Sequence, residues 1–289
     1  MTIRKILAPV SGSERDVSAL HAACRLAQSL PAHVTALFAK MSPNEAVPMV
    51  GEGVSSTVVE QLMTTAEQEW NRRATLARRH FDACRDEFDV PQRSTPTRPP
   101  TASAEWVEET GREDAVVRRL GAVNDLIVLP NQTGSDDDLQ FTLTFEGTLL
   151  SGCRPVLLAP AGDPGHVGRV VSIAWNGDIP VSRAVTAAMP ILTQAERVHV
   201  LTAGSHRTPE EAGSGLVDFL AWHGIDAEIH RFPQNGRKIG AILLDAASGL
   251  DSDLLVMGGY GHSRMRELIL GGVTRYLLTN AEIGVLMAH

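Results

Sequence analysis

The stretch GGYGHSRMRELILGGVTR, from Gly258 to Arg275, has glycines at both ends of one amphipathic run and directly follows the apolar run DLLVM, Asp253 to Met257. Glycine costs conformational entropy in a regular element, so this clustering indicates main chain that adopts positive φ or lies close to a ligand. In an open parallel sheet, ligands bind where strands end and helices begin with unpaired N–H groups. The stretch therefore predicts an anion site, with a phosphate chain held close to the backbone. The alternative is a tight connection with close helix packing and no ligand.

The glycine stretch differs from two common phosphate-binding motifs. A Walker A loop needs a lysine after its last glycine, and no lysine occurs between Gly258 and Arg275. A dinucleotide fingerprint follows the first strand of its unit, whereas this stretch follows the fourth predicted strand of the second half. The stretch offers two sets of backbone donors instead, one at Gly258 to Gly261 and one at a helix start, Gly271 and Gly272.

The chain contains the same order of segments twice. In each half an apolar strand, a turn and a helix of small and apolar residues come first, and two short apolar strands come last. The matching pairs are KILAPVSGSERDVSALHAACRLAQSL at 5–30 with RVVSIAWNGDIPVSRAVTAAMPILTQ at 169–194, DLIVLP at 125–130 with DLLVMG at 253–258, and RPVLLAPA at 154–161 with IGVLMAH at 283–289. Matches at both ends of each half predict a tandem duplication, with its seam near AGDPGHVG at 161–168.

Strands and helices alternate in the second half, which predicts a parallel sheet covered on both faces. We expect strands at 170–175, 197–202, 227–231, 253–257 and 285–288, and helices at 179–192, 208–223 and 238–248. The first half follows the same plan with a longer middle. There, residues 54–90 predict one long helix, and the Pro-, Ser- and Thr-rich residues 91–103 predict an extended, mobile connector. The sequence therefore predicts two α/β domains, at 1–162 and 169–289.

Composition narrows the class of protein. The chain has 289 residues, a formal net charge of -8 and three cysteines in no metal-binding or disulfide spacing. An acidic protein lacks the basic face that nucleic acids require. No segment has the roughly 18 consecutive apolar residues that span a bilayer, and the first residues do not read as a signal peptide. We therefore expect a cytoplasmic protein that binds neither nucleic acid nor membrane.

The spacing of Gly258, two residues, Gly261, nine residues and Gly271 is similar to the signature of the universal stress protein family, which reads Gly, two, Gly, nine, Gly and then Ser or Thr. The segments GHSRMREL and GGVTRYLL also resemble a common form of it. The resemblance covers almost the whole chain, as a tandem of two domains, but only the second half has the full signature. It implies two Rossmann-like domains of the adenine nucleotide α-hydrolase type. Each would be a five-stranded parallel sheet flanked by helices, and some members of the family bind ATP.

Three positions of the second half bear on whether it binds a nucleotide. Gly272 stands where the signature has a hydroxyl, and the lost hydrogen bond would weaken binding by about 1.5–3 kcal/mol, roughly tenfold or more in affinity. Thr274 matches a position where the family often has another hydroxyl. Asn176 stands in the turn where ATP-binding members usually carry an acid, and its amide can still accept a bond from a ribose hydroxyl or an adenine amino group.

The first half departs further from the family pattern. Ser11 stands at the acid position, Pro130 replaces the first glycine, and the run Asp136 to Asp138 would repel phosphate. Consecutive carboxylates in a loop are usually solvated, so this run is read as surface charge and not as a metal site. We predict that the first domain is degenerate, binds no nucleotide and serves as a scaffold.

The resemblance places the predicted site in the second domain. The residues around Asn176 would face the base or ribose, Gly258 and Gly261 the ribose and phosphates, and the start of the last helix the phosphates. Arg264 would either clamp a phosphate through two hydrogen bonds or lie exposed, and His262 is expected as a capping or surface residue more than as a base. The predicted binding residues are Ala174, Trp175, Asn176, Met257, Gly258, Gly261, His262, Arg264, Gly271, Gly272, Val273 and Thr274.

We predict a stress-related regulator that binds ATP or AMP, with or without magnesium, and acts by binding and not by catalysis. The sequence shows no Ser-His-Asp or Cys-His set, no HExxH motif, and no acid placed to hold a metal beside the glycine stretch. Slow ATP hydrolysis is left open. One alternative is an interaction protein of the same fold without nucleotide, and another is a related nucleotide α-hydrolase or transferase enzyme.

The last strand of each half indicates how the two halves associate; these strands are Pro155 to Ala159 and Val285 to Ala288. Such a strand lies at a sheet edge and needs a partner. We expect the two to pair within the chain, which would imitate the dimer of single-domain family members. A homodimer of chains and an unidentified protein partner are left open.

Overall fold

A computed structural model gives the fold of most of the chain. The described residues are 2–41, 56–132, 139–151, 154–162, 165–203, 213–232, 236–259 and 271–289. Three of the predicted binding residues, Gly261, His262 and Arg264, lie outside these ranges, as does the acidic run Asp136 to Asp138.

The N-terminal half, residues 2–162, alternates strands and helices. Its elements are β1 (Lys5–Val10), α1 (Asp16–Ser29), β2 (His33–Lys40), α3 (Ser56–Glu87), β3 (Ser103–Thr110), α4 (Glu113–Gly121), β4 (Leu126–Leu129), α5 (Leu139–Glu146), the π-helix η1 (Gly147–Ser151) and β5 (Val156–Leu158). The long helix predicted at 54–90 is α3. The predicted connector leads into β3, and its Gln92 forms an isolated bridge with Ala104.

The C-terminal half, residues 165–289, repeats the plan. Its elements are β6 (Val170–Ala174), α6 (Ile179–Leu192), β7 (Arg197–Ala203), α7 (Ser214–Trp222), β8 (Ala227–Phe232), α8 (Ile239–Gly249), β9 (Leu254–Gly258), α9 (Gly272–Asn280) and β10 (Gly284–Ala288). The strands and helices predicted here are confirmed, with small differences at their ends, except that residues 208–212 of the helix predicted at 208–223 lie outside the described residues. The predicted domain limits at 162 and 169 fall between β5 and β6 and stay a prediction.

The described strands form one ten-stranded sheet in the order β3-β2-β1-β4-β5-β10-β9-β6-β7-β8. Within each half all pairings are parallel, whereas β5 and β10 pair antiparallel, with Leu157 opposite Leu286. The pairing of β5 with β10 joins the five parallel strands of each half into one continuous sheet. The physical reason is that β5 and β10 would otherwise each present unpaired backbone groups at an edge. The intramolecular strand pairing predicted from the sequence is confirmed.

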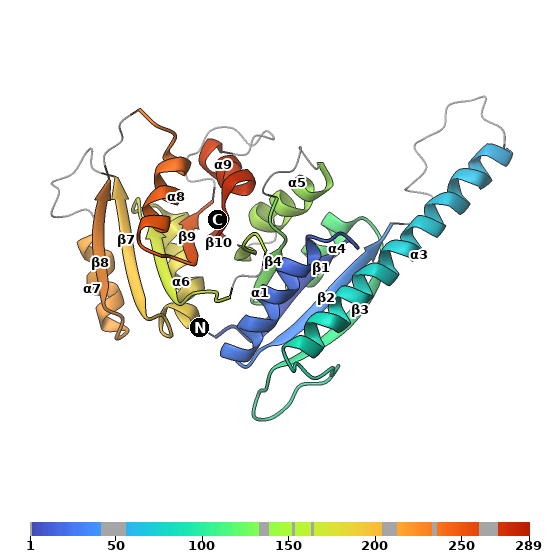
Figure 1. The fold of residues 1–289 in the computed structure, drawn as a ribbon, viewed down its shortest axis with the longest axis horizontal. Coiled ribbons are helices and arrows are strands. Elements are labelled where there is room, and N and C mark those ends of the chain that lie inside the picture. The colour runs from blue at the N-terminus through green and yellow to red at the C-terminus, as the bar shows by residue number, and fades with distance from the viewer. Residues whose placement is uncertain are drawn as a thin grey trace.

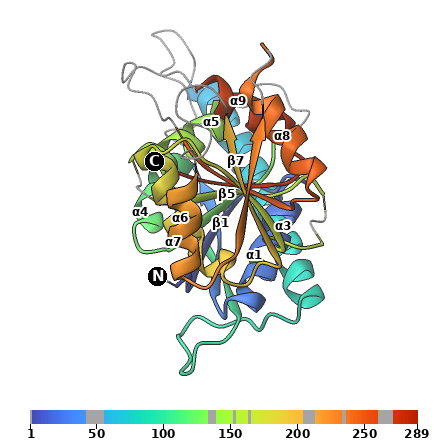
Figure 2. The same ribbon diagram turned by 90° about the vertical axis from the view of Figure 1, so that its left-hand side faces the viewer.

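Helices cover both faces of the sheet, because parallel strands are apolar on both sides. One face carries α1, α3, α6 and α7, whose buried side chains pack with Ile6, Ala8 and Val256. The opposite face carries α4, α5, α8 and α9, which pack with the alternate strand residues Leu7 and Leu255. The two halves lie side by side in Figure 1, and Figure 2 shows the strands crossing at large angles, as a twisted sheet requires.

Helix α3 is longer than the sheet that it covers. Its C-terminal part buries Ala77, Phe81 and Cys84 in the core, while its N-terminal part is mostly exposed and extends beyond the sheet (Figure 1). Cys84 lies against Cys24 of α1, with 3.4 Å between the two sulfur atoms, and both are free thiols. The sequence did not predict this contact.

None of the helices in the described part of the chain is long and apolar enough to cross a membrane.

Candidate functional site

The predicted site begins where two central strands of the C-terminal half end. Strands β6 and β9 are parallel neighbours, and Ala174 at the end of β6 pairs with Met257 of β9. From β6 the chain runs outward to β7 and β8, and then crosses back to β9 on the other side. Such a reversal of strand order is where open α/β sheets bind ligands. The structure thus brings the residues after Ala174 and those after Met257 to one end of the sheet.

The turn after β6 is formed by Asn176, Gly177 and Asp178. Gly177 has a φ of 79°, which favours glycine. The Asn176 amide donates to the Asp178 carboxylate at 2.8 Å, and the Asp178 N–H donates to the Asn176 side-chain oxygen at 3.1 Å. Asn176 is exposed, so one lone pair and one N–H of its amide stay available to a ligand. Asp178 adds a carboxylate that the sequence reasoning did not place in the site.

Trp175 lies between this turn and the core. Its backbone N–H donates to the Leu201 carbonyl of β7 at 2.9 Å, and its half-buried ring packs against the core of the α6 face. Part of the Trp175 ring therefore belongs to the core, and only its exposed part could stack on a base.

Gly258 is required by packing. A Cβ atom on Gly258 would lie 2.6 Å from the Val181 backbone nitrogen and 2.9 Å from the Pro180 Cβ, both at the start of α6. The end of β9 and the start of α6 therefore touch. Gly259 continues the sheet, because its N–H donates to the Ala288 carbonyl at 2.8 Å. Close packing, the alternative considered for the glycine stretch, thus accounts for Gly258 by itself.

Gly271 and Gly272 differ from Gly258. They occupy the N-cap and the first residue of α9, both are exposed, and a Cβ on either would meet no described residue within 4 Å. No side chain of the described residues caps the helix start, and the first N–H groups of a helix are the ones that can bind an anion. Val273 is half-buried, and Thr274 is only 2% exposed, which turns its side chain toward the protein interior. The predicted phosphate contact of Thr274 stays a prediction.

The same turn in the N-terminal half is filled by the protein itself. The Asp16 carboxylate accepts hydrogen bonds from the backbone N–H groups of Ser11, Gly12 and Ser13 at 2.9, 2.6 and 3.1 Å. The hydroxyls of Ser11 and Ser13 also lie 3.2 Å from it. Asp16 is 1% exposed. Burial raises the pKa of its carboxyl, while the hydrogen bonds from Ser11, Gly12 and Ser13 act in the opposite direction.

Helix α3 closes this N-terminal turn from outside. A Cβ on Gly12 would lie 2.5 Å from the Arg73 carbonyl oxygen of α3, and the Arg73 guanidinium donates to the Ser11 carbonyl at 2.7 Å. At the nearby end of β4, Asn131 and Gln132 are buried, and Gln132 accepts a bond from Arg15 at 2.9 Å. In the C-terminal half, a Cβ on the corresponding Gly177 would meet none of the described residues within 4 Å.

Comparison with known proteins finds a family match in the C-terminal half. Residues 187–289 match the family described as universal stress protein family, which supports the resemblance from the middle of α6 to β10. A universal stress protein from Archaeoglobus fulgidus DSM 4304 is similar in structure, with a TM-score of 0.70 and 12% identity, covering 98% of this chain and 97% of that one. A functionally unknown protein from Pseudomonas aeruginosa PAO1 has a TM-score of 0.57 and 15% identity, covering 98% and 92%. These two likenesses show the fold. No curated protein matches the sequence.

Proposed function

We propose that the universal stress protein domain of the C-terminal half binds an adenine nucleotide, ATP or AMP, where β6 and β9 end. The observation that carries this proposal is the contrast between two equivalent turns. Asp16 and α3 fill the turn at Gly12, whereas no described residue lies within 4 Å of a Cβ placed on Gly177, which sits at a reversal of strand order. We infer that a site which the fold provides twice is closed in the N-terminal half and open to a ligand in the C-terminal half.

Each part of the proposed site has a distinct role. Asn176, with Ala174 and Trp175 beside it, would face the base and ribose. Met257 and Gly258 would line the ribose side, with Gly261, His262 and Arg264 continuing toward the phosphates. Gly271, Gly272 and Val273 would present the helix start, and Thr274 would contact the phosphates if its side chain turned outward. Asp178 would accept a hydrogen bond from a ribose hydroxyl.

We propose that nucleotide occupancy regulates the protein and that the protein does not turn nucleotide over. Phosphoryl transfer needs groups that hold a metal and orient water beside the phosphates. Among the described residues, the one group of three histidines and acids that could hold a metal lies on β7 and β8, away from the turn at Gly177. Long incubation with ATP and Mg²⁺ is expected to yield no product above the protein-free background, and product formation would argue for an enzyme.

Gly272 allows a test in which binding improves. Replacing Gly272 by Ser restores the hydroxyl at the start of α9, where the added Cβ meets nothing within 4 Å. One added hydrogen bond to a charged oxygen should tighten nucleotide binding roughly tenfold or more. Isothermal titration calorimetry of the wild-type protein and of Gly272→Ser with AMP and with ATP and Mg²⁺ measures this directly.

A matched control is available at Gly215, which is exposed, is the second residue of α7 and also has nothing within 4 Å of an added Cβ. Gly215→Ser should bind nucleotide as the wild type does. The proposal is contradicted if neither the wild type nor Gly272→Ser binds at millimolar nucleotide. It is also contradicted if Gly215→Ser tightens binding as much as Gly272→Ser.

The second candidate function is an interaction protein of this fold that carries no nucleotide. It is favoured by Asn176, whose amide is already bonded to Asp178, and by Gly258, which packing against α6 explains without a ligand. Thermal unfolding with increasing AMP or ATP separates the two functions, because a ligand that binds only the folded state raises the midpoint of thermal unfolding. The interaction protein predicts no shift of that midpoint with AMP or ATP.

A further inference from the structure

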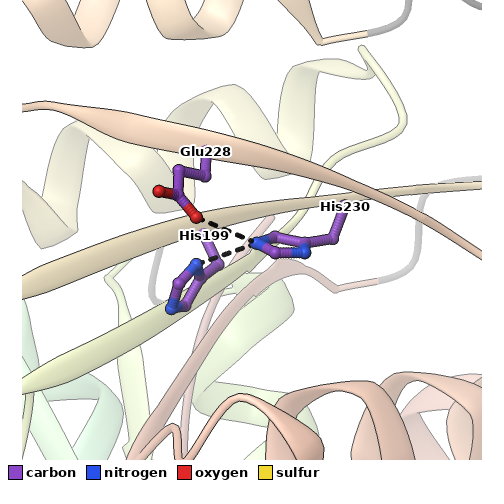
Figure 3. A group of neighbouring side chains, drawn as sticks. All are labelled: His199, Glu228 and His230. Carbon is purple, nitrogen blue, oxygen red and sulfur yellow. Dashed lines mark hydrogen bonds and ion pairs between the residues drawn. The ribbon is translucent and has the colours of Figure 1, made fainter.

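Three potential metal ligands lie on one face of the two outer strands of the C-terminal half. His199 is on β7, and Glu228 and His230 are on the edge strand β8. Residues two apart on a strand point to the same face, and the register pairs His199 directly with Glu228. The three side chains therefore converge, as Figure 3 shows. The sequence reasoning missed this group, because only the register of β7 with β8 brings it together.

The ligand atoms are close enough to share one ion. His199 Nδ1 and His230 Nε2 are 3.0 Å apart, and Glu228 Oε2 lies 3.7 Å from His230 Nε2 (Figure 3). All three ligand atoms lie within 4.8 Å of one another. A tetrahedral zinc ion with bonds of about 2.0–2.1 Å separates its ligand atoms by roughly 3.3 Å. Small side-chain rotations of the exposed Glu228 and the partly exposed His230 would reach that spacing.

Burial distinguishes this group from chance surface neighbours. His199 is only 4% exposed, and its Nε2 has no hydrogen-bond partner among the described residues. Its other nitrogen, Nδ1, is directed at the nitrogen of a second imidazole. A buried imidazole with an unpaired nitrogen is costly, so a stronger interaction at Nδ1 would offset part of that cost. The Glu228 side chain is 79% exposed, which leaves one side of the group open to solvent.

The surroundings of His199 favour the neutral form of its ring over the protonated form. Burial lowers the pKa of His199, and so do the neighbouring His230 and Arg197, while Glu228 acts in the opposite direction. A neutral imidazole has a free lone pair for a metal ion, whereas a protonated one has none. The positive Arg197 guanidinium repels a second positive charge at His199. The negative Glu228 carboxylate compensates for this repulsion.

We propose that His199, Glu228 and His230 form a site for a divalent transition-metal ion that prefers imidazole and carboxylate ligands, with Zn²⁺ as the expected ion. Three protein ligands, two histidines and one glutamate, leave a fourth position for water or for a ligand from outside. The ion ties the edge strand β8 to β7, which stabilises a strand that otherwise has a neighbour on one side only.

This metal site does not depend on the proposed nucleotide site. His199 is the third residue of β7 and Glu228 the second of β8, so they lie toward the amino ends of their strands. The turn at Gly177 lies beyond the carboxyl end of β6, which is parallel to β7. A protein that binds Zn²⁺ without nucleotide, or the reverse, would therefore separate the two proposals.

The test is calorimetric titration of Zn²⁺ into untagged full-length protein that has been freed of metal with a chelator. We expect one tight site per chain in the wild type. Glu228→Gln and His230→Gln change partly exposed side chains and should leave the fold intact, and each should weaken this binding by more than about tenfold. His199→Gln should do the same. His223→Gln is the control, because His223 is exposed on the C-terminal end of α7 and belongs to no such group.

A second readout is the visible spectrum of Co²⁺ added in place of Zn²⁺. The wild type should show intense absorption typical of four-coordinate Co²⁺, and Glu228→Gln should lose it. The proposal is overturned if the wild type binds no Zn²⁺. It is equally overturned if Glu228→Gln and His230→Gln bind Zn²⁺ as tightly as His223→Gln, since the ion would then sit on other histidines.

Discussion

Asp16 shows how one residue can decide whether a turn is open to a ligand. Its carboxylate takes the place in the N-terminal half that an external anion would take, accepting N–H groups from Ser11, Gly12 and Ser13. In the C-terminal half the acid is Asp178, which bonds the side chain of Asn176 instead of the turn's backbone. The difference between the two turns therefore lies in the position of one carboxylate and in the cover that α3 gives the N-terminal turn.

Substitution of Asp16 tests this role. Asp16→Ala leaves the partly buried N–H groups of Ser11, Gly12 and Ser13 without their acceptor, and each unsatisfied group costs up to about 1–3 kcal/mol. We expect a loss of about 2–5 kcal/mol in the free energy of unfolding, measured by urea denaturation. Asp16→Asn keeps one acceptor oxygen and should lose less. Equal stability of Asp16→Ala and the wild type would contradict the contacts described.

The same substitution predicts a pH dependence. Because burial raises the pKa of Asp16 in the folded state, the folded protein holds this proton at pH values where the unfolded chain has released it. The contribution of Asp16 is therefore fully present below about pH 3.9 and is lost as the pH rises through the folded-state pKa. The stability of the wild type relative to Asp16→Asn should fall over this range, followed by urea denaturation at several pH values. A relative stability that increased with pH would contradict the direction of the shift.

Glycine residues mark the limit of what sequence can show at this scale. Gly258 and Gly272 belong to the same motif, yet Gly258 is fixed by contact with Pro180 and Val181, whereas Gly272 is exposed and has no described residue within 4 Å of an added Cβ. The sequence correctly predicted that the glycines lie where β9 ends and α9 begins. It could not separate a packing glycine from an exposed one, because the partners come from α6, about 80 residues earlier in the chain.

At the scale of secondary-structure elements, each half has an aspartate at the same position, directly before β4 in one half and before β9 in the other. Asp125, before β4, accepts the N–H groups of Arg4 and Lys5 at 2.8 and 3.0 Å. Asp253, before β9, accepts those of Arg169 and Val170, both at 3.1 Å, and that of Gly168. Each carboxylate thus fixes the start of one strand to the start of its parallel neighbour.

Asp253→Ala should therefore destabilise the junction of β6 and β9. Hydrogen bonds to a charged group are worth about 1.5–3 kcal/mol, and we expect a loss of about 2–3 kcal/mol in the free energy of unfolding. Asp226→Ala changes an exposed aspartate of the same half and should stay within about 0.5 kcal/mol of the wild type. A loss at Asp226→Ala as large as at Asp253→Ala would mean that surface charge, and not this contact, controls stability.

Most elements were predictable because their patterns are local. The apolar strands, the helix at 179–192 and the long helix α3 follow from periodicity and length. The order of strands in the sheet depends on crossovers, and the contact of Cys24 with Cys84 depends on how α1 meets α3, so neither follows from local pattern. The group of His199, Glu228 and His230 was missed for the same reason.

At the scale of the whole molecule, the two halves share one sheet and both cores. The hydrophobic cluster on one face includes Leu20 and Val185, and the cluster on the other includes Leu7 and Leu277. The joint runs through β5 and β10, where Leu157 and Leu286 are fully buried. This continuity favours unfolding of the halves as one unit, although each half repeats the same plan.

Differential scanning calorimetry tests that continuity. We expect one transition, with equal calorimetric and van't Hoff enthalpies. Leu157→Ala should lower the free energy of unfolding by about 2–5 kcal/mol and shift the whole transition. Leu62→Ala, at an exposed position of α3, should change it little. Two separate transitions in the wild type would show that the halves unfold independently.

The central claim is that the C-terminal half offers an open nucleotide site and the N-terminal half a closed one. The most direct measurement is an NMR titration of the ¹⁵N-labelled protein with AMP, followed at the backbone amides of Gly12, Gly177, Gly258 and Gly272. The account predicts saturable shifts at Gly177, Gly258 and Gly272 and none at Gly12. No shifts at millimolar AMP, or shifts at Gly12 equal to those at Gly177, would contradict it.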